Sequence, residues 1–126
     1  MKRILKKKKK ILLSQNIAAL SGDVVSKKGY VSAIDLFLAL GWLTPNKLAD
    51  WKIGKIPYLE AVLTANLAKL TKAMKEFRAW AVHSRLKPSI TVYKHKGIQL
   101  RFSKSANPTI ENAYSTHYVL IESDKQ

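Results

Sequence analysis

The feature that most constrains the fold is a stripe of apolar side chains between Pro57 and Pro88. Its members recur every three or four residues, which is the spacing of one face of an α-helix: Leu59, Leu63, Leu67, Leu70, Met74, Phe77 and Ala81. Lys72 falls almost directly opposite this stripe, so the same segment has a basic back. The spacing therefore predicts one long amphipathic helix over about residues 57–86, whose apolar face packs in a core.

Two shorter helices are predicted upstream from the signals at their ends. Ser32 and Asp35 have the spacing of a capping box, with aspartate in place of glutamate, and Gly41 ends the apolar run that follows them. Thr44 and Pro45 combine an N-cap residue with a proline at the first helical position. With the long helix, these two make a three-helix unit.

Beyond the long helix the pattern changes to alternating apolar and polar residues, which is typical of β-strands. The apolar members are Ile90, Val92, Ile98, Leu100 and Phe102. We expect a β-hairpin over about 89–103, with a three-residue loop at 95–97 that puts its glycine in the left-handed position. This register gathers the apolar residues on one face and leaves Tyr93 and Arg101 on the other.

The C-terminal region predicts one more short helix, because Asn107 and Pro108 repeat the N-cap and proline signature. The tail over 117–121 is compatible with a short strand. The whole pattern predicts an α+β protein. It has a basic N-terminal arm over residues 1–28, partly disordered or helical, and one α+β domain over residues 29–126.

Positive charge dominates the composition, with 23 Lys and Arg against 8 Asp and Glu and a formal net charge of +15. Seven of these cations lie within the first ten residues, and thirteen lie between Lys47 and Lys104 beside three acids. Such an excess indicates an anionic partner, and we expect DNA or RNA bound mainly through its phosphates. The cations expected to contact phosphate are Lys6, Lys7, Lys8, Lys9 and Lys10 of the arm and Lys69, Lys72, Arg101 and Lys104 of the domain.

The composition also excludes several classes of site. The chain has no cysteine, so disulfides, thiolate zinc sites and cysteine nucleophiles are excluded. His83, His95 and His117 are 12 and 22 residues apart, which fits no helical metal pair, so we expect no metal and no cofactor. No apolar stretch suits a signal peptide or a membrane span, and we expect a cytoplasmic protein.

One local cluster predicts a phosphate site. Arg101, Ser103, Lys104 and Ser105 come immediately before Asn107, where a helix is expected to begin. The unpaired N–H groups of a helix N-terminus suit an oxyanion, and two hydroxyls and two cations beside them would complete the site. The alternative is an ordinary polar loop in which Asn107 caps its own helix.

Tyr93 predicts a second kind of contact. It shares the expected exposed face of the hairpin with Arg101, and an aromatic ring beside a cation on a sheet can stack the bases of a single strand. The alternative is that the Tyr93 ring covers the edge of the sheet.

Two other functions remain open at this point. A metal-independent ribonuclease would need a base, an acid and a cation around one phosphate, and His95, Arg101 and His117 are the candidates. A protein-interaction module or an anionic-membrane-surface module would use the Lys-rich arm instead.

Residues 32–70 resemble the helix-turn-helix domains of phage repressors. The likeness rests on Trp51, Gly54 and Pro57, spaced Trp-x-x-Gly-x-x-Pro after a helix end at Leu40 and Gly41. The resemblance implies that the residues facing the DNA major groove are Asn46, Lys47 and Asp50.

A broader stretch, residues 29–119, resembles a group of small bacterial proteins of unknown function. The resemblance is carried by Gly41–Pro45, Ile56–Glu60, Phe102–Ser105 and Tyr114–Val119. It implies no particular activity.

Overall fold

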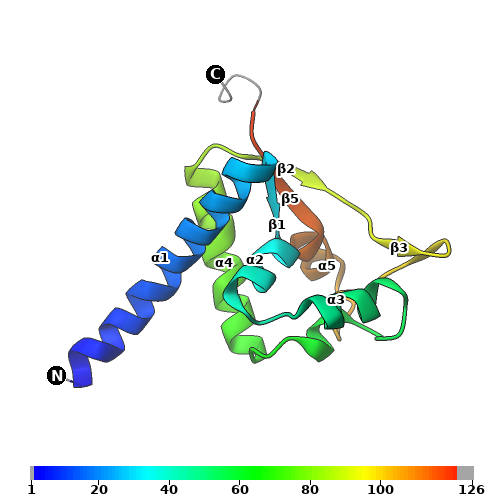
Figure 1. Ribbon diagram of the computed structural model, residues 1–126, viewed down its shortest axis with the longest axis horizontal. Helices are drawn as coiled ribbons and strands as arrows, with labels where there is room; N and C mark the ends of the chain where they lie inside the picture. Colours follow the sequence, from blue (N-terminus) through cyan, green and yellow to red (C-terminus); the bar gives the residue numbers. More distant parts are fainter. Residues whose placement is uncertain (1, 122–126) are drawn as a thin grey trace.

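The computed structural model describes the backbone of residues 2–121 and the side chains of residues 13–121. Over this part the helices are α1 (Lys2–Lys28), α2 (Ala33–Leu40), α3 (Pro45–Lys52), α4 (Leu67–His83) and α5 (Pro108–Ser115), with a 3-10 turn η1 (Leu59–Val62). The strands are β1 (Tyr30–Ser32), β2 (Lys87–Ile90), β3 (Lys94–His95), β4 (Ile98–Gln99) and β5 (Thr116–Val119) (Figure 1). The protein is therefore α+β, as predicted.

The short helices begin where their caps predict. The Ser32 hydroxyl accepts a hydrogen bond from the Asp35 amide at 3.1 Å, and the Asp35 carboxylate accepts one from the Ser32 amide at 3.0 Å, so the capping box is complete. Thr44 caps α3 and Asn107 caps α5, each with proline at the start of the helix. Gly41 ends α2 with a φ of 78°, in the left-handed region that favours glycine.

The long helix is confirmed, but its expected start at residue 57 is wrong. The α4 helix begins only at Leu67, after the Asn66 side chain accepts a hydrogen bond from the Lys69 amide at 2.8 Å. The preceding η1 turn is held by bonds from the Leu59 amide to the Arg101 carbonyl, at 3.1 Å, and from the Glu60 amide to the Phe102 carbonyl, at 2.9 Å. Between η1 and α4 the backbone leaves the helical conformation, since Leu63 is extended with a ψ of 139° and the Thr64 amide donates to the Trp42 carbonyl at 3.0 Å.

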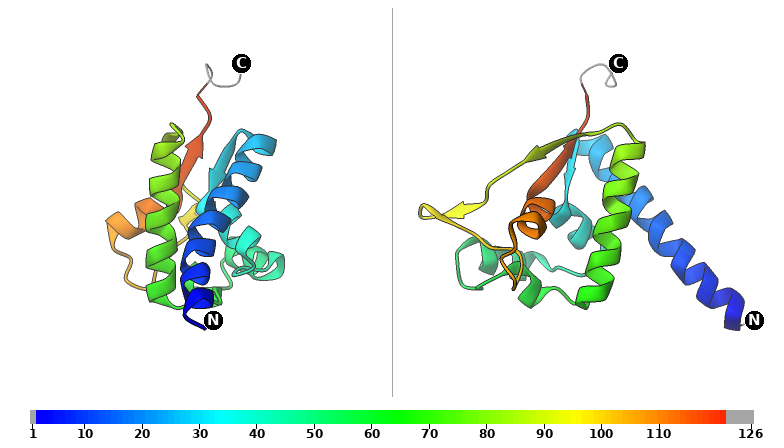
Figure 2. Two further views of the ribbon diagram at one scale, coloured as in Figure 1. Left: turned by 90° about the vertical axis from the view of Figure 1, so that its left-hand side faces the viewer. Right: turned by 180° about the vertical axis from the view of Figure 1, so that it is seen from behind.

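The expected N-terminal arm forms one continuous helix, α1, which runs through Gly22 to Lys28. Ile17, Ser21 and Val25 are buried, and α1 contacts α4, α2 and β1. Figure 2 shows α1 and α4 side by side. Residues 13–28 thus help to build the core, and the N-terminal end of α1 extends away from it (Figure 1).

The main sheet has the order β1-β5-β2, with β5 antiparallel to both neighbours. Its inner face packs Tyr118 edge-on against Phe77 of α4, with ring centroids 5.1 Å apart. On its other face His117 lies between Ser32 of β1 and Ser89 of β2. The C-terminal strand matches the expectation, whereas β1 was not predicted because three residues are too few to show an alternating pattern.

The hairpin is present, but the predicted register is wrong. His95 pairs with Ile98, so the loop is the two residues Lys96 and Gly97, with φ values of 51° and 78°. Two positive φ values are typical of a type I′ turn, whose twist suits a two-residue hairpin. In this register Tyr93 lies opposite Leu100 and faces inward, whereas the predicted register placed Tyr93 on the exposed face.

Candidate nucleic-acid interface

The loop predicted to bind phosphate already holds an anion from the chain itself. The Glu111 carboxylate, on α5, accepts hydrogen bonds from the Phe102 amide at 2.9 Å and the Ser103 amide at 2.7 Å. It also accepts a very short hydrogen bond from the Ser103 hydroxyl, which is buried. Glu111 therefore occupies the donors that a phosphate would need.

A second carboxylate holds the other side of the same loop. Glu60, on η1, accepts a hydrogen bond from the Lys104 amide at 2.9 Å and another from the Tyr114 hydroxyl at 2.7 Å. Burial and this bond to Glu60 raise the pKa of Tyr114 far above its usual value. The loop is thus fixed by two acids brought to it from η1 and α5.

Other donors in and beside the loop are also used within the chain. The Asn107 side chain accepts hydrogen bonds from the Thr109 and Ile110 amides, which are the exposed amides of the α5 N-terminus. The Ser105 hydroxyl accepts one from the Asn107 amide at 3.2 Å. The geometry is that of the polar-loop alternative, in which Asn107 caps its own helix.

Arg101 differs from its neighbours in this loop. Its guanidinium donates to the carbonyls of Ser103 at 2.9 Å and Lys104 at 3.0 Å, and it lies 5.4 Å from the centre of the Tyr58 ring. Neutral carbonyls orient the group without neutralising it, and no carboxylate between residues 13 and 121 forms an ion pair with it. Arg101 is a positioned cation on an exposed surface.

Arg101 lines a hollow of about 540 Å³ between the β3–β4 hairpin and the turn after α3, which we call the hairpin groove. The apolar residues of the hairpin groove are Ile53, Ile56, Pro57, Ile98 and Leu100, and the polar ones are His95, Lys96, Gln99 and Arg101. Gly54 lies across the hairpin groove from the His95 ring, and its φ of +79° is in the left-handed region that favours glycine.

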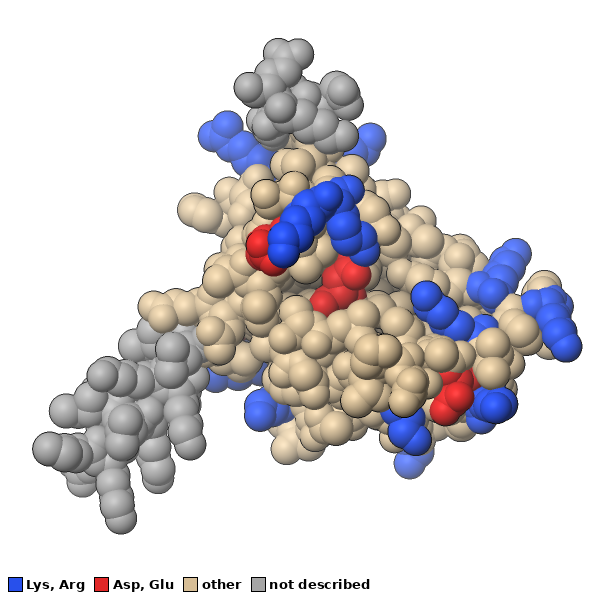
Figure 3. Space-filling model, in the orientation of Figure 1, with Lys and Arg blue, Asp and Glu red and all other residues tan. Residues whose placement is uncertain are grey.

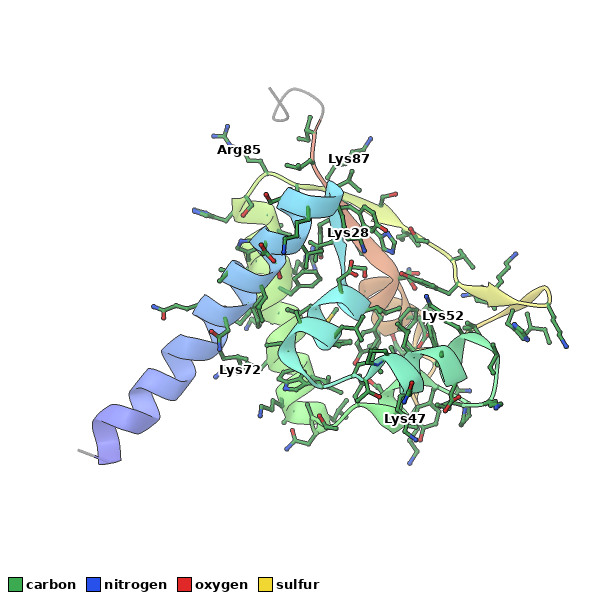
Figure 4. The ribbon with its side chains drawn as sticks, in the orientation of Figure 1. Lys28, Lys47, Lys52, Lys72, Arg85 and Lys87 are labelled. Carbon is green, nitrogen blue, oxygen red and sulfur yellow. The ribbon has the colours of Figure 1, made fainter. Side chains whose placement is uncertain are left out.

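Exposed cations occur on both chain segments that line the hairpin groove. Lys96 and Arg101 line it, and each of the others is next in sequence to a lining residue; we call this set the basic corner, formed by Lys52, Lys55, Lys94, Lys96 and Arg101. Asp50 is the only acid in segments 45–56 and 90–101. Figure 3 shows several basic side chains over α3 and the hairpin, and Figure 4 labels Lys47 and Lys52 of that region.

The acids of the described chain do not neutralise this corner. Between residues 13 and 121, ion pairs are formed only by Lys27 with Asp23, at 3.1 Å, and by Lys28 with Asp35, at 2.9 Å. Both pairs lie near the end of α1 and the start of α2. The basic corner therefore keeps its charge.

The other cations predicted to contact phosphate do not share this corner. In Figure 4, Lys72 lies at the left of the molecule and Lys52 at the right. The Lys69 ammonium lies 5.5 Å from the centre of the Trp42 ring. Lys104 lines a smaller hollow beside Tyr58. The side chains of Lys6, Lys7, Lys8, Lys9 and Lys10 lie outside the described residues.

Tyr93 has the packing role that was the alternative at this position. Its ring lies 5.7 Å from Trp51 and 5.5 Å from Phe102, and its hydroxyl is 2.6 Å from Nε2 of His117. His117 in turn stacks on Tyr30 with ring centroids 5.2 Å apart. These contacts attach the base of the hairpin to the sheet. Burial of the Tyr93 side chain also raises its pKa.

His117 is not in the same hollow as the other two residues expected for a ribonuclease. His95 and Arg101 line the hairpin groove, whereas His117 lies under the base of the hairpin with Tyr93. Burial lowers the pKa of His117, Asp35 raises it and Lys28 lowers it, with burial the strongest effect. The geometry does not assemble the three groups around one phosphate.

The cations at the end of α3 and in the hairpin were missed by sequence analysis. Lys52 and Lys55 are separated from Lys94 and Lys96 by about forty residues of chain. The only local signal is that both segments are basic and almost free of acids. Their proximity depends on the tertiary structure.

Searches against protein-family models, curated proteins and solved structures find no significant similarity. Among the described residues, no three or more His, Asp and Glu side chains gather in a way that could hold a metal ion. Within the same part of the chain, no helix has the length and apolar character needed to span a membrane.

Proposed function

We propose that this protein binds nucleic acid without catalysing a reaction on it, through phosphate contacts made by the basic corner and by the Lys-rich start of α1. The observation that carries the proposal is the basic corner itself. Lys96 and Arg101 line one groove, three further exposed lysines are next in sequence to its lining residues, and the ion pairs of residues 13–121 lie elsewhere.

The physical basis is the release of counterions from the phosphate backbone. Each lysine or arginine that neutralises a phosphate releases a condensed cation, so the logarithm of the affinity falls linearly with the logarithm of the salt concentration. A protein that makes about six to ten such contacts loses roughly 10³–10⁵ in affinity between about 50 and 200 mM salt. The net charge of +15 supports contacts of this kind.

A salt titration tests the proposal. We expect a fluorescently labelled oligonucleotide to bind the full chain with a steep salt dependence, measured by anisotropy. The variant Lys52→Gln/Lys55→Gln/Lys96→Gln should reduce the slope by about three, since each phosphate contact contributes about one. Binding that does not change with salt would reject the proposal.

The matched control removes the same charge from other surfaces. Lys72→Gln/Lys75→Gln/Lys87→Gln changes two exposed residues of α4 and one of β2. We expect this variant to bind almost as tightly as the wild type. If it loses as much affinity as the corner variant, net charge and not the basic corner determines binding.

A further inference from the structure

We infer that the hairpin groove binds one unpaired nucleotide, with its phosphate at Arg101 and its base against the apolar wall, so that the protein prefers single strands to duplex. This inference rests on the proposed function and specifies its ligand. Three features of the groove support it: a positioned cation, exposed apolar side chains, and polar groups between them.

The phosphate end of the site is defined by Arg101. Two backbone carbonyls and the Tyr58 ring hold its guanidinium in place, which leaves its other N–H groups for a ligand. A fixed planar guanidinium suits the paired oxygens of a phosphate, because little side-chain freedom is lost on binding. Lys96 lines the same groove and adds a second positive charge.

The base end is defined by apolar side chains that the fold leaves uncovered. Ile98 is 71% exposed and Ile53 is 48% exposed, and they lie on opposite sides of the hairpin groove. Covering such surface is favourable by about 25 cal/mol for each Å² removed from water. A flat nucleobase that enters between the two sides would cover both.

Polar groups between these ends suit the edge of a base. The His95 ring and the Gln99 amide line the hairpin groove and offer both donors and acceptors. A hollow of about 540 Å³ is also within the usual range for small-ligand sites.

A duplex cannot use this site, because its bases are paired and stacked and only its phosphates are accessible to the groove. Base-specific contacts in single-stranded complexes depend on bases splayed out of the strand. A duplex has twice as many phosphates as a single strand of the same length, so charge alone favours the duplex. A preference for the single strand must therefore come from the base.

A second hollow, between α4 and α5, supplies a matched control. It contains Val82, 67% exposed, and the cations Lys75 and Arg78, so its composition is similar. No side-chain hydrogen bond within residues 13–121 positions Arg78 as Arg101 is positioned. Val82→Ser and Ile98→Ser remove comparable exposed β-branched side chains from the two hollows.

The experiment measures anisotropy of the full chain with labelled twelve-nucleotide single strands of DNA and of RNA, and with the duplex of the DNA sequence, at one salt concentration. We expect at least one single strand to bind about tenfold more tightly than the duplex, from the contribution of one base contact. Ile98→Ser should remove that preference and leave duplex affinity unchanged, whereas Val82→Ser should change neither. A strand of abasic nucleotides should bind no better than the duplex.

Equal affinity for single strands and duplex, or an equal loss of both in Ile98→Ser, would overturn the inference. If both bind equally with a steep salt dependence, the proposed nucleic-acid binding stands and the nucleotide site fails. If neither shows salt-dependent binding, the proposed function itself fails. Because Ile98 is mostly exposed, its replacement by serine leaves the core intact, and circular dichroism checks this.

Discussion

The loop at residues 101–107 and the basic corner are both rich in cations and polar groups, yet the fold uses them differently. In the loop, Glu60 and Glu111 accept hydrogen bonds from the amides that would otherwise hold an anion. In the corner no acid of the described chain forms an ion pair with a lysine or arginine. Composition alone does not distinguish the basic corner from the loop at residues 101–107. The difference is that the loop is hydrogen-bonded to carboxylates of the chain itself.

The two regions meet at Arg101, which belongs to both. Its carbonyl accepts a hydrogen bond from the Trp51 indole at 2.8 Å and another from the Leu59 amide at 3.1 Å. The backbone of this residue is therefore structural, while its exposed side chain contributes to the lining of the hairpin groove. The carbonyls of Ser103 and Lys104 in this loop hold the guanidinium of Arg101, which is one of the cations of the basic corner.

The largest expected effect comes from removing the anion in the loop. Glu111→Ala leaves two amides and the buried Ser103 hydroxyl without their acceptor, which should lower the free energy of unfolding by about 3 kcal/mol. Urea denaturation measures this loss. Because the loop is then an empty anion site, we expect sulfate to stabilise Glu111→Ala more than the wild type.

Glu111→Gln is the matched control for that change. It keeps one acceptor oxygen and should lose less stability than Glu111→Ala. A Glu111→Ala protein as stable as the wild type, or one that sulfate does not stabilise further, would contradict the view that the carboxylate occupies an anion site.

The next effect concerns the attachment of the hairpin, and so of the corner, to the sheet. Burial lowers the pKa of His117 below its ordinary value of 6.5, so the unfolded chain binds a proton more readily than the folded one. The contribution of neutral His117 to the free energy of unfolding is complete above about pH 6.5, and it is lost as the pH falls toward the folded-state pKa. Urea denaturation at a series of pH values should show the decline.

A His117→Gln variant should have a smaller decline in stability over the same pH range, because it has no ring to protonate. The other two histidines are unchanged and serve as an internal reference. An identical pH dependence in the variant and the wild type would show that His117 is not the group responsible.

The smallest effect separates folding from binding within the corner. Lys96 has a φ of 51° in the type I′ turn, a position that asparagine adopts more readily than lysine. Lys96→Asn should therefore raise the free energy of unfolding by about 0.5 kcal/mol. It should also reduce the salt slope of nucleic-acid binding by about one, because one phosphate contact is lost. Equal or improved binding would show that Lys96 does not contact phosphate.

Much of the fold could be predicted because its signals are local. Ser32, Thr44 and Asn107 cap their own helices through amides two or three residues away, so three helix starts follow from short stretches of sequence. The errors concern long-range partners. The late start of α4 is accompanied by the bond from the Thr64 amide to the Trp42 carbonyl, and the two-residue hairpin loop is accompanied by packing of Tyr93 against Trp51.

The candidate site was less predictable than the fold for the same reason. Arg101 was identified from the sequence, but the hydroxyl of its expected partner Ser103 bonds to Glu111 of α5, and that of Ser105 bonds to the Asn107 amide. The cations that join it, Lys52 and Lys94 among them, come from segments that local patterns could not connect.

By itself, the sequence determined the excess of positive charge, the helix caps and the long apolar stripe. Each of these depends on composition or on residues within one or two turns of each other. Only the tertiary structure decided where the acids lie relative to the cations. Electrostatic interactions depend on distance in space, and the chain places Glu60 and Glu111 at the loop while leaving the basic corner unpaired.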